Sequence, residues 1–193
     1  MLTKLSLSLG LALGCSIGLS NAAFAQSLVI GDGGAQECFH SVKHGDPGRI
    51  STIKDCKLAL RDPNLSKKDE AATHVNLGIL LMRAKRYDDS RAQYNLAIKM
   101  QPELSEAYIN YAANLIYLGD FDAAITASNK GIELGTKKMP EALFNRAMAY
   151  DNLKRYNLAY ADLKKALTLR PNWKPALRAI DNYEVAAKPT SQG

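Results

Sequence analysis

The sequence lacks the residue groups on which most enzymes depend. It contains only three histidines, His40, His44 and His74, and none of them stands at a recognisable spacing from a nucleophile. The neighbouring acids Asp88 and Asp89 fall in an expected turn, where acidic residues suit the start of a helix. The sequence therefore predicts a protein that has no catalytic activity and needs no cofactor.

Long hydrophobic runs are missing except near the amino terminus. The run from Leu5 to Leu19 is shorter than the roughly 20 residues of a membrane-spanning helix and contains three glycines. It is followed by Ala23-Phe24-Ala25, an A-x-A cleavage site, before Gln26. We therefore predict a signal peptide, residues 1–25, and export to the periplasm.

A second processing interpretation stays open at Cys15. The tripeptide Leu13-Gly14-Cys15 resembles the end of a bacterial lipoprotein signal, in which lipid is attached to the cysteine. The match is imperfect, because Ala12 and Leu13 stand in swapped order. Both interpretations export the protein.

Cysteine is scarce, and its spacing excludes two common motifs. The absence of C-x-x-C-H excludes the simplest covalent haem attachment, and the absence of C-x-x-C excludes a thioredoxin-type redox motif. Cys38 and Cys56 remain after export, and we expect them to form a disulfide worth about 3 kcal/mol. The alternative is a metal site formed with His40 and His44, since two sulfurs and two imidazoles can bind an ion tetrahedrally. That spacing matches no established metal motif, so the prediction is a disulfide and no metal.

The charge is moderately basic and is not arranged for nucleic acid. Removing residues 1–25 takes away only Lys4, so the net charge falls from +6 to +5. Aromatic and basic residues are not interleaved on one face, as single-stranded nucleic acid binding requires. Basic residues gather instead in expected turns, which predicts either solubility alone or contact with an anionic envelope surface. This basic edge consists of Arg83, Lys85, Arg86, Lys154 and Arg155.

What the sequence does contain is one helical-hairpin pattern that occurs three times in register. The pattern covers residues 71–104, 105–139 and 140–173. In each unit, apolar residues recur at the i, i+3, i+4 and i+7 spacing of an amphipathic helix. Gly78, Ala112 and Ala147 hold matching places and would let a neighbouring helix approach closely. A period near 34 residues indicates stacked helical hairpins, which present a surface to a partner.

These repeats resemble the tetratricopeptide repeat. The resemblance rests on Asn76-Leu77-Gly78, on Ala97 and on Pro102 in the first unit, and it recurs in the other two. It implies an all-α fold, a right-handed superhelical stack of antiparallel helix hairpins. Around the repeats we expect further segments: a flexible leader (26–34), a degenerate amino-terminal helix hairpin (35–66), a carboxy-terminal capping helix (174–187) and a disordered tail (188–193).

The resemblance also implies where a ligand binds. First helices of successive hairpins line a concave groove in this family, so the residues beside the core stripe are the candidates: Asn76, Ile79, Arg83, Asn110, Ala113, Tyr117, Asn145, Met148 and Asn152. Asn76, Asn110 and Asn145 fall at identical places and could hold an extended peptide by its backbone. Alternatively, they only contact the adjacent hairpin.

The resulting hypothesis is an adaptor of the cell envelope that binds a protein or peptide in this groove. The alternative is an assembly factor that docks on an envelope complex or anionic surface through its basic turns.

Overall fold

The computed structural model describes residues 2–4 and 33–185 of the 193-residue chain. Most of the predicted signal peptide, including Cys15, and nearly all of the predicted leader lie outside the described residues. The predicted tail (188–193) lies outside them too.

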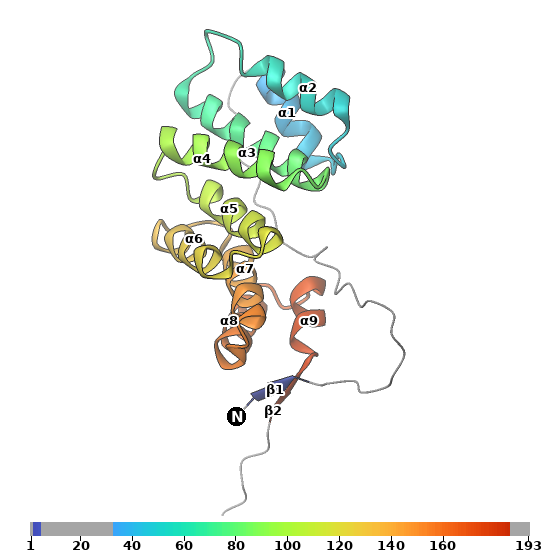
Figure 1. The fold of residues 1–193 in the computed structure, drawn as a ribbon, viewed down its shortest axis with the longest axis vertical. Helices are drawn as coiled ribbons and strands as arrows, with labels where there is room; N and C mark the ends of the chain where they lie inside the picture. Colours follow the sequence, from blue (N-terminus) through green and yellow to red (C-terminus); the bar gives the residue numbers. More distant parts are fainter. Residues whose placement is uncertain (1, 5–32, 186–193) are drawn as a thin grey trace, which may run out of the picture.

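The described chain forms a stack of helical hairpins (Figure 1). The helices are α1 (Gly34–Lys43), α2 (Ile50–Ala59), α3 (Lys67–Arg83), α4 (Tyr87–Met100), α5 (Ser105–Leu118), α6 (Phe121–Glu133), α7 (Met139–Asn152), α8 (Tyr156–Leu169) and α9 (Lys174–Ile180). Each helix packs mainly on its neighbours in the sequence, and α3, α5 and α7 also contact one another in succession. The all-α solenoid predicted from the repeats is confirmed. No helix among the described residues is long and apolar enough to cross a membrane.

Local chemistry fixes where several helices begin. Ser66 caps α3, because its hydroxyl accepts a hydrogen bond from the Asp69 N–H at 3.1 Å and donates one to the Asp69 carboxylate. Asp120 caps α6, because its carboxylate accepts a 3.3 Å hydrogen bond from the Ala123 N–H. Prolines in the first turns of α7 and α9 suit positions where a backbone donor would have no helical partner.

The hairpins share their cores with the next unit. The largest cluster of buried side chains runs from the disulfide of the amino-terminal hairpin through α3 and α4 to Ala107 and Ala113 of α5. Gly78 is essential to this packing, since a Cβ there would lie 2.5 Å from the ring of the fully buried Tyr94. The amino-terminal hairpin and the first repeat therefore form one packed unit.

The carboxy-terminal cap differs from the prediction. We expected a helix over 174–187, but α9 ends at Ile180 and Tyr183–Val185 form a strand, β2, antiparallel to β1 (Leu2–Lys4). Tyr183 is buried beside Tyr156 and Tyr160, and its hydroxyl donates a 2.6 Å hydrogen bond to Asp151. Burial and this hydrogen bond raise the pKa of Tyr183. The last repeat is thus closed by a short helix and one tyrosine. Because β1 belongs to the predicted signal peptide, cleavage after Ala25 would remove the partner of β2.

Candidate functional site

The three asparagines that the sequence aligned lie on α3, α5 and α7, and all are completely buried. The Asn145 side-chain amide donates to the Ile109 carbonyl of α5 at 3.1 Å, and that of Asn110 donates to the Glu106 carbonyl of its own helix at 2.9 Å. Asn76 also has a partner. The sequence placed these residues beside the core stripe, whereas the structure places them within the packed interior. At least Asn145 therefore joins adjacent hairpins.

The other predicted groove residues are also more enclosed than the sequence suggested. Ile79 and Ala113 are fully buried in the cluster that joins the first hairpins. Tyr117 stacks on Tyr87 with ring centroids 5.0 Å apart. Met148 is half-buried, and only Asn152 is exposed, with its amide donating to the Met148 carbonyl. The accessible residues Tyr117 and Asn152 lie near the carboxy-terminal ends of α5 and α7. A partner that approached this face would contact these ends before it reached the buried asparagines.

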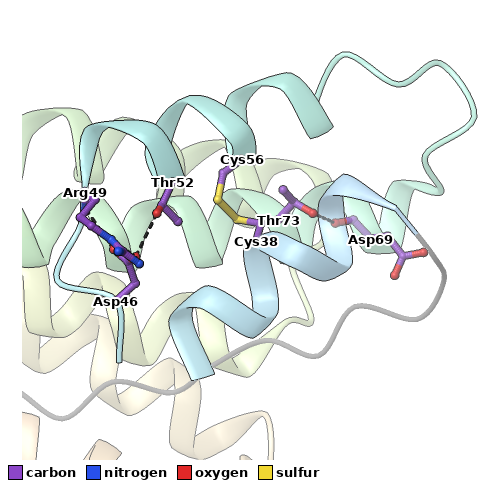
Figure 2. The surroundings of a disulfide bond; sticks show 7 residues. All are labelled: Cys38, Asp46, Arg49, Thr52, Cys56, Asp69 and Thr73. Carbon is purple, nitrogen blue, oxygen red and sulfur yellow. Dashed lines mark hydrogen bonds and ion pairs between the residues drawn. A yellow bond between two sulfur atoms is a disulfide. The ribbon is translucent and has the colours of Figure 1, made fainter. Parts of the chain in front are cut away.

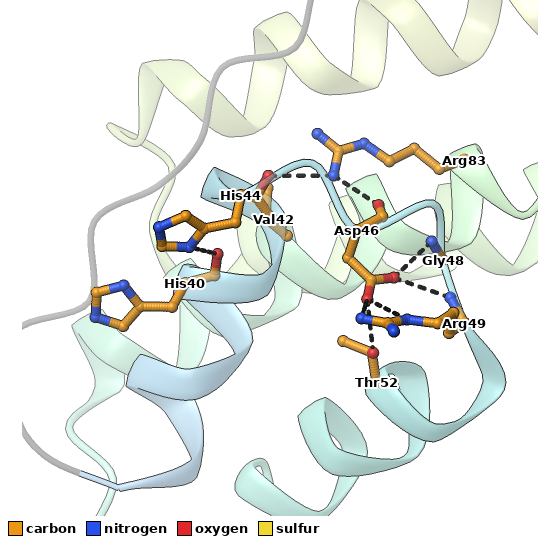
Figure 3. A network of polar contacts seen from close by, with 8 residues as sticks. All are labelled: His40, Val42, His44, Asp46, Gly48, Arg49, Thr52 and Arg83. Atoms are coloured by element: carbon orange, nitrogen blue, oxygen red, sulfur yellow. Dashed lines mark hydrogen bonds and ion pairs between the residues drawn. The ribbon is translucent and has the colours of Figure 1, made fainter.

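Arg83, predicted to line the groove and the basic edge, instead holds the amino-terminal hairpin on the repeats. Its guanidinium donates to the carbonyl oxygen of Val42 in the last turn of α1 (3.1 Å) and to that of Asp46 in the α1–α2 connection (2.8 Å) (Figure 3). Desolvation lowers the pKa of Arg83, opposed by attraction to Asp46. The half-buried cation therefore serves the scaffold.

The carboxylate of Asp46 organises the same connection, a role that sequence reasoning missed. It accepts hydrogen bonds from the Gly48 and Arg49 backbone N–H groups, the Arg49 side chain and the Thr52 hydroxyl, at 2.8 to 3.0 Å. Its side chain is only 2% exposed. The signal was present in the sequence, because an aspartate before Pro-Gly often bonds to the backbone that follows it.

These contacts predict a dependence of stability on pH. Burial alone would raise the pKa of Asp46, but the hydrogen bonds from Arg49, Gly48 and Thr52 outweigh burial and lower the pKa from 3.8 to about 2. A lowered folded-state pKa stabilises the protein above pH ~4, and this contribution is lost as the pH falls toward ~2. We expect Asp46→Asn to reduce the free energy of unfolding by about 2 kcal/mol at pH 7 and by much less near pH 2.

Urea denaturation of both proteins across this pH range measures the difference. Asp62→Asn is the matched control, because the exposed Asp62 carboxylate accepts one backbone hydrogen bond, from Asn64. A constant difference between Asp46→Asn and the parent protein from pH 7 to pH 2 would contradict the assignment.

The basic edge is partly neutralised. Arg86 pairs with Asp89 at 2.6 Å and Arg155 with Asp122 at 3.3 Å. Lys85 and Lys154 are exposed and hold equivalent places in their turns, both with a positive φ near 60°. Gly119 occupies that place in the middle repeat. Each of the three turns thus needs a residue with a left-handed backbone at this place. The side-chain charges of Lys85 and Lys154 remain in solvent.

The predicted disulfide is present between Cys38 of α1 and Cys56 of α2 (Figure 2). Both cysteines are buried, and the bridge removes the two sulfur ligands that the alternative metal site needed. Among residues 2–4 and 33–185, no group of three or more histidine, cysteine, aspartate or glutamate side chains is placed to hold a metal ion.

Comparison with known proteins matches the repeats directly. Sequence models of the tetratricopeptide repeat match residues 71–104, 105–134 and 140–172. The chain is 25% identical over 115 residues to Sperm-associated antigen 1 of Rattus norvegicus, covering 60% of this chain and 13% of that protein. It is 32% identical over 80 residues to Protein O-mannosyl-transferase Tmtc1 of Drosophila melanogaster, covering 39% of this chain and 9% of that protein. The chain therefore spans only a small part of these relatives.

Solved structures show the same arrangement. The Arabidopsis OM64 TPR domain superposes with a TM-score of 0.57 at 28% identity, covering 60% of this chain and 95% of that domain. The crystal structure of MamA gives a TM-score of 0.61 at 22% identity, covering 79% of this chain and 82% of that one, which shows a shared fold. The chain belongs to the tetratricopeptide-repeat family, and its role is that of a protein-interaction adaptor.

Proposed function

We propose that this protein is an exported, non-catalytic adaptor that binds a protein or peptide through the face formed by α3, α5 and α7. The observation that carries the proposal is the repetition of three hairpins in register, whose first helices, α3, α5 and α7, contact one another in succession. Such a regular stack holds first helices side by side, which suits recognition of an extended segment.

The accessible part of this face sets the chemistry of the partner. Tyr117, Met148 and Asn152 offer aromatic, apolar and amide surface, and the same two helices carry two half-buried acids, Glu106 in the first turn of α5 and Asp151 in the last turn of α7. This mixture favours a peptide segment with apolar and polar side chains over a highly acidic ligand.

Export is proposed from the sequence of residues 1–25 and is supported by the disulfide. Disulfides persist in oxidising compartments such as the periplasm and are rare in the cytosol. Cell fractionation followed by amino-terminal sequencing of the mature protein tests this part. A mature chain that begins at Gln26 in the periplasmic fraction is expected, and an uncleaved cytosolic chain would overturn it.

Site-specific photocrosslinking tests the binding face. A photoreactive residue at Asn152, on α7, is expected to capture a partner that the same residue at Leu158, on α8, does not capture. Both positions are exposed, so accessibility alone does not separate them. Crosslinking from Leu158 and not from Asn152 would place the partner on the second helices and overturn the proposed face.

The alternative function, docking through the basic edge, is separated by salt. Binding through exposed charges such as Lys85 and Lys154 weakens steeply as ionic strength rises, because their attraction is screened. Contacts on the α3, α5 and α7 face are mainly uncharged and should persist. Capture that disappears between low and high salt, and that is lost in a Lys85→Gln, Lys154→Gln variant, would favour the alternative.

A further inference from the structure

Two of the three histidines lie one turn apart at the carboxy-terminal end of α1, with His40 in the last turn of the helix and His44 at its C-cap. The rings of His40 and His44 are nearly parallel, with an interplanar angle of 21° and centroids 5.9 Å apart. Figure 3 shows the two rings next to each other. The third histidine, His74, lies apart from them and contacts the side chain of Gln93 at 2.8 Å. His40 and His44 therefore form a pair of neighbouring imidazoles, in which both rings could bind the same ligand.

The hydrogen bond of His44 fixes which of its ring nitrogens is available. The Nδ1 atom of His44 lies 2.8 Å from the main-chain oxygen of His40. A carbonyl oxygen can only accept, so Nδ1 carries the hydrogen and the lone pair resides on Nε2. Histidines that bind metals usually donate their other ring N–H to a carbonyl or carboxylate in this way, which holds the ring in position.

The surroundings leave room for an ion and its water ligands. Both histidines line an open hollow of about 500 Å³, together with Glu37, Asp46 and Arg49. Glu37 stands one turn before His40 on α1, and its side chain is exposed. The nearby Arg49 cation is paired with the Asp46 carboxylate at 2.7 Å, which offsets its repulsion of a bound cation. The hollow is thus compatible with a divalent ion held at the two rings.

We propose that His40 and His44 chelate a divalent first-row transition-metal ion, Cu²⁺, Ni²⁺ or Zn²⁺, with water completing the coordination. Histidines four residues apart on one helical turn can present their nitrogens to a common point, and the C-cap position of His44 continues the last turn of α1. Imidazole nitrogen selects these ions over Mg²⁺ and Ca²⁺, which prefer oxygen ligands. Of the three ions, Cu²⁺ binds such a site most tightly. The site differs from the cysteine-containing one considered from the sequence, because the sulfurs of Cys38 and Cys56 are joined to each other.

Isothermal titration of the full, untagged chain with CuCl₂ tests the site, with NiCl₂, ZnCl₂ and MgCl₂ titrated separately. We expect one Cu²⁺ per chain, weaker binding of Ni²⁺ and Zn²⁺, and no binding of Mg²⁺. His40→Ala and His44→Ala should each weaken Cu²⁺ binding at least tenfold, and the double variant should abolish it. His74→Gln is the matched control, because it removes the remaining histidine and should leave the affinity unchanged.

Electron paramagnetic resonance of the Cu²⁺ complex supplies an independent measurement. Hyperfine coupling to imidazole nitrogen is expected in the parent protein and in His74→Gln, and it should be absent from the double variant. Circular dichroism checks that each variant keeps its helices. Undiminished Cu²⁺ binding in a folded double variant would overturn the proposal, as would the absence of binding by the parent protein.

Discussion

Reduction of the Cys38–Cys56 disulfide is expected to lower the free energy of unfolding by about 3 kcal/mol. The bridge spans 18 residues, and closing a loop of this size removes about that much conformational entropy from the unfolded chain. The effect should concentrate in α1 and α2, because α2 has few neighbours in the described chain apart from α1 and α3. Loss of the bridge leaves this terminal hairpin held mainly by buried side chains such as Val42 and Ile53 and by Arg83.

Urea denaturation with and without a thiol reductant measures the change, and hydrogen exchange locates it. Amides of α1 and α2 are expected to lose protection before those of α5 to α8. Replacing Cys38 and Cys56 together by alanine should reproduce the result without reductant. Cys15→Ala is the control, since the third cysteine lies in the predicted signal peptide. A uniform loss of protection along all helices would show instead that the hairpin and the repeats unfold as one unit.

The regular part of this molecule could be predicted from the sequence because its determinants are local. Helices follow from the 3.6-residue recurrence of apolar side chains, and hairpins follow from its repetition every 34 residues or so. The close helix packing that Gly78 indicated was also predictable, because the contact lies within one hairpin. Any larger residue at position 78 would clash with the ring of Tyr94. The disulfide was predictable as well, since only two cysteines remained after the predicted cleavage.

The exposed face could not be predicted in the same way. Neighbouring positions on a helix differ by only about 100°, so a residue beside the core stripe is buried or exposed according to how the next hairpin is tilted. Asn145 shows this, because its amide reaches the Ile109 carbonyl of α5. The end of α9 was missed for a related reason. Ile180 and Tyr183 have a helical spacing, but Tyr183 reaches Asp151 from an extended segment.

The partners of Arg146 could not be predicted either. This charged residue lies on the apolar stripe of α7, and sequence spacing does not show which residues of other helices contact it. Its guanidinium forms two 2.7 Å hydrogen bonds with the carboxylate of Asp162 on α8, and a third with the amide oxygen of Asn129 on α6 at 2.6 Å. The hydrogen bond to Asp162 raises the pKa of Arg146. Its side chain is 21% exposed and that of Asp162 10%. This ion pair therefore connects the two helices of the last repeat, α7 and α8. The contact with Asn129 connects α7 to α6 of the preceding repeat.

Replacing Arg146 by methionine is expected to reduce the free energy of unfolding by about 3 kcal/mol. Methionine keeps much of the apolar stem but leaves the Asp162 carboxylate enclosed without its cation, and an uncompensated charge is the costly outcome of breaking a buried pair. Adding Asp162→Leu should recover part of the loss, because the carboxylate is then absent. The single variant should therefore be less stable than the double variant.

Thermal and urea denaturation of the two single variants and the double variant form a mutant cycle that isolates the interaction. Arg91→Met is the matched control. Arg91 pairs with Asp88 within α4 at 2.8 Å, but both side chains are largely exposed, so about 0.5 kcal/mol or less is expected. Equal losses from Arg146→Met and Arg91→Met would show that burial adds nothing to the pair. A double variant no more stable than Arg146→Met would show that the loss comes from packing around Arg146, and the charge on Asp162 would then not be its cause.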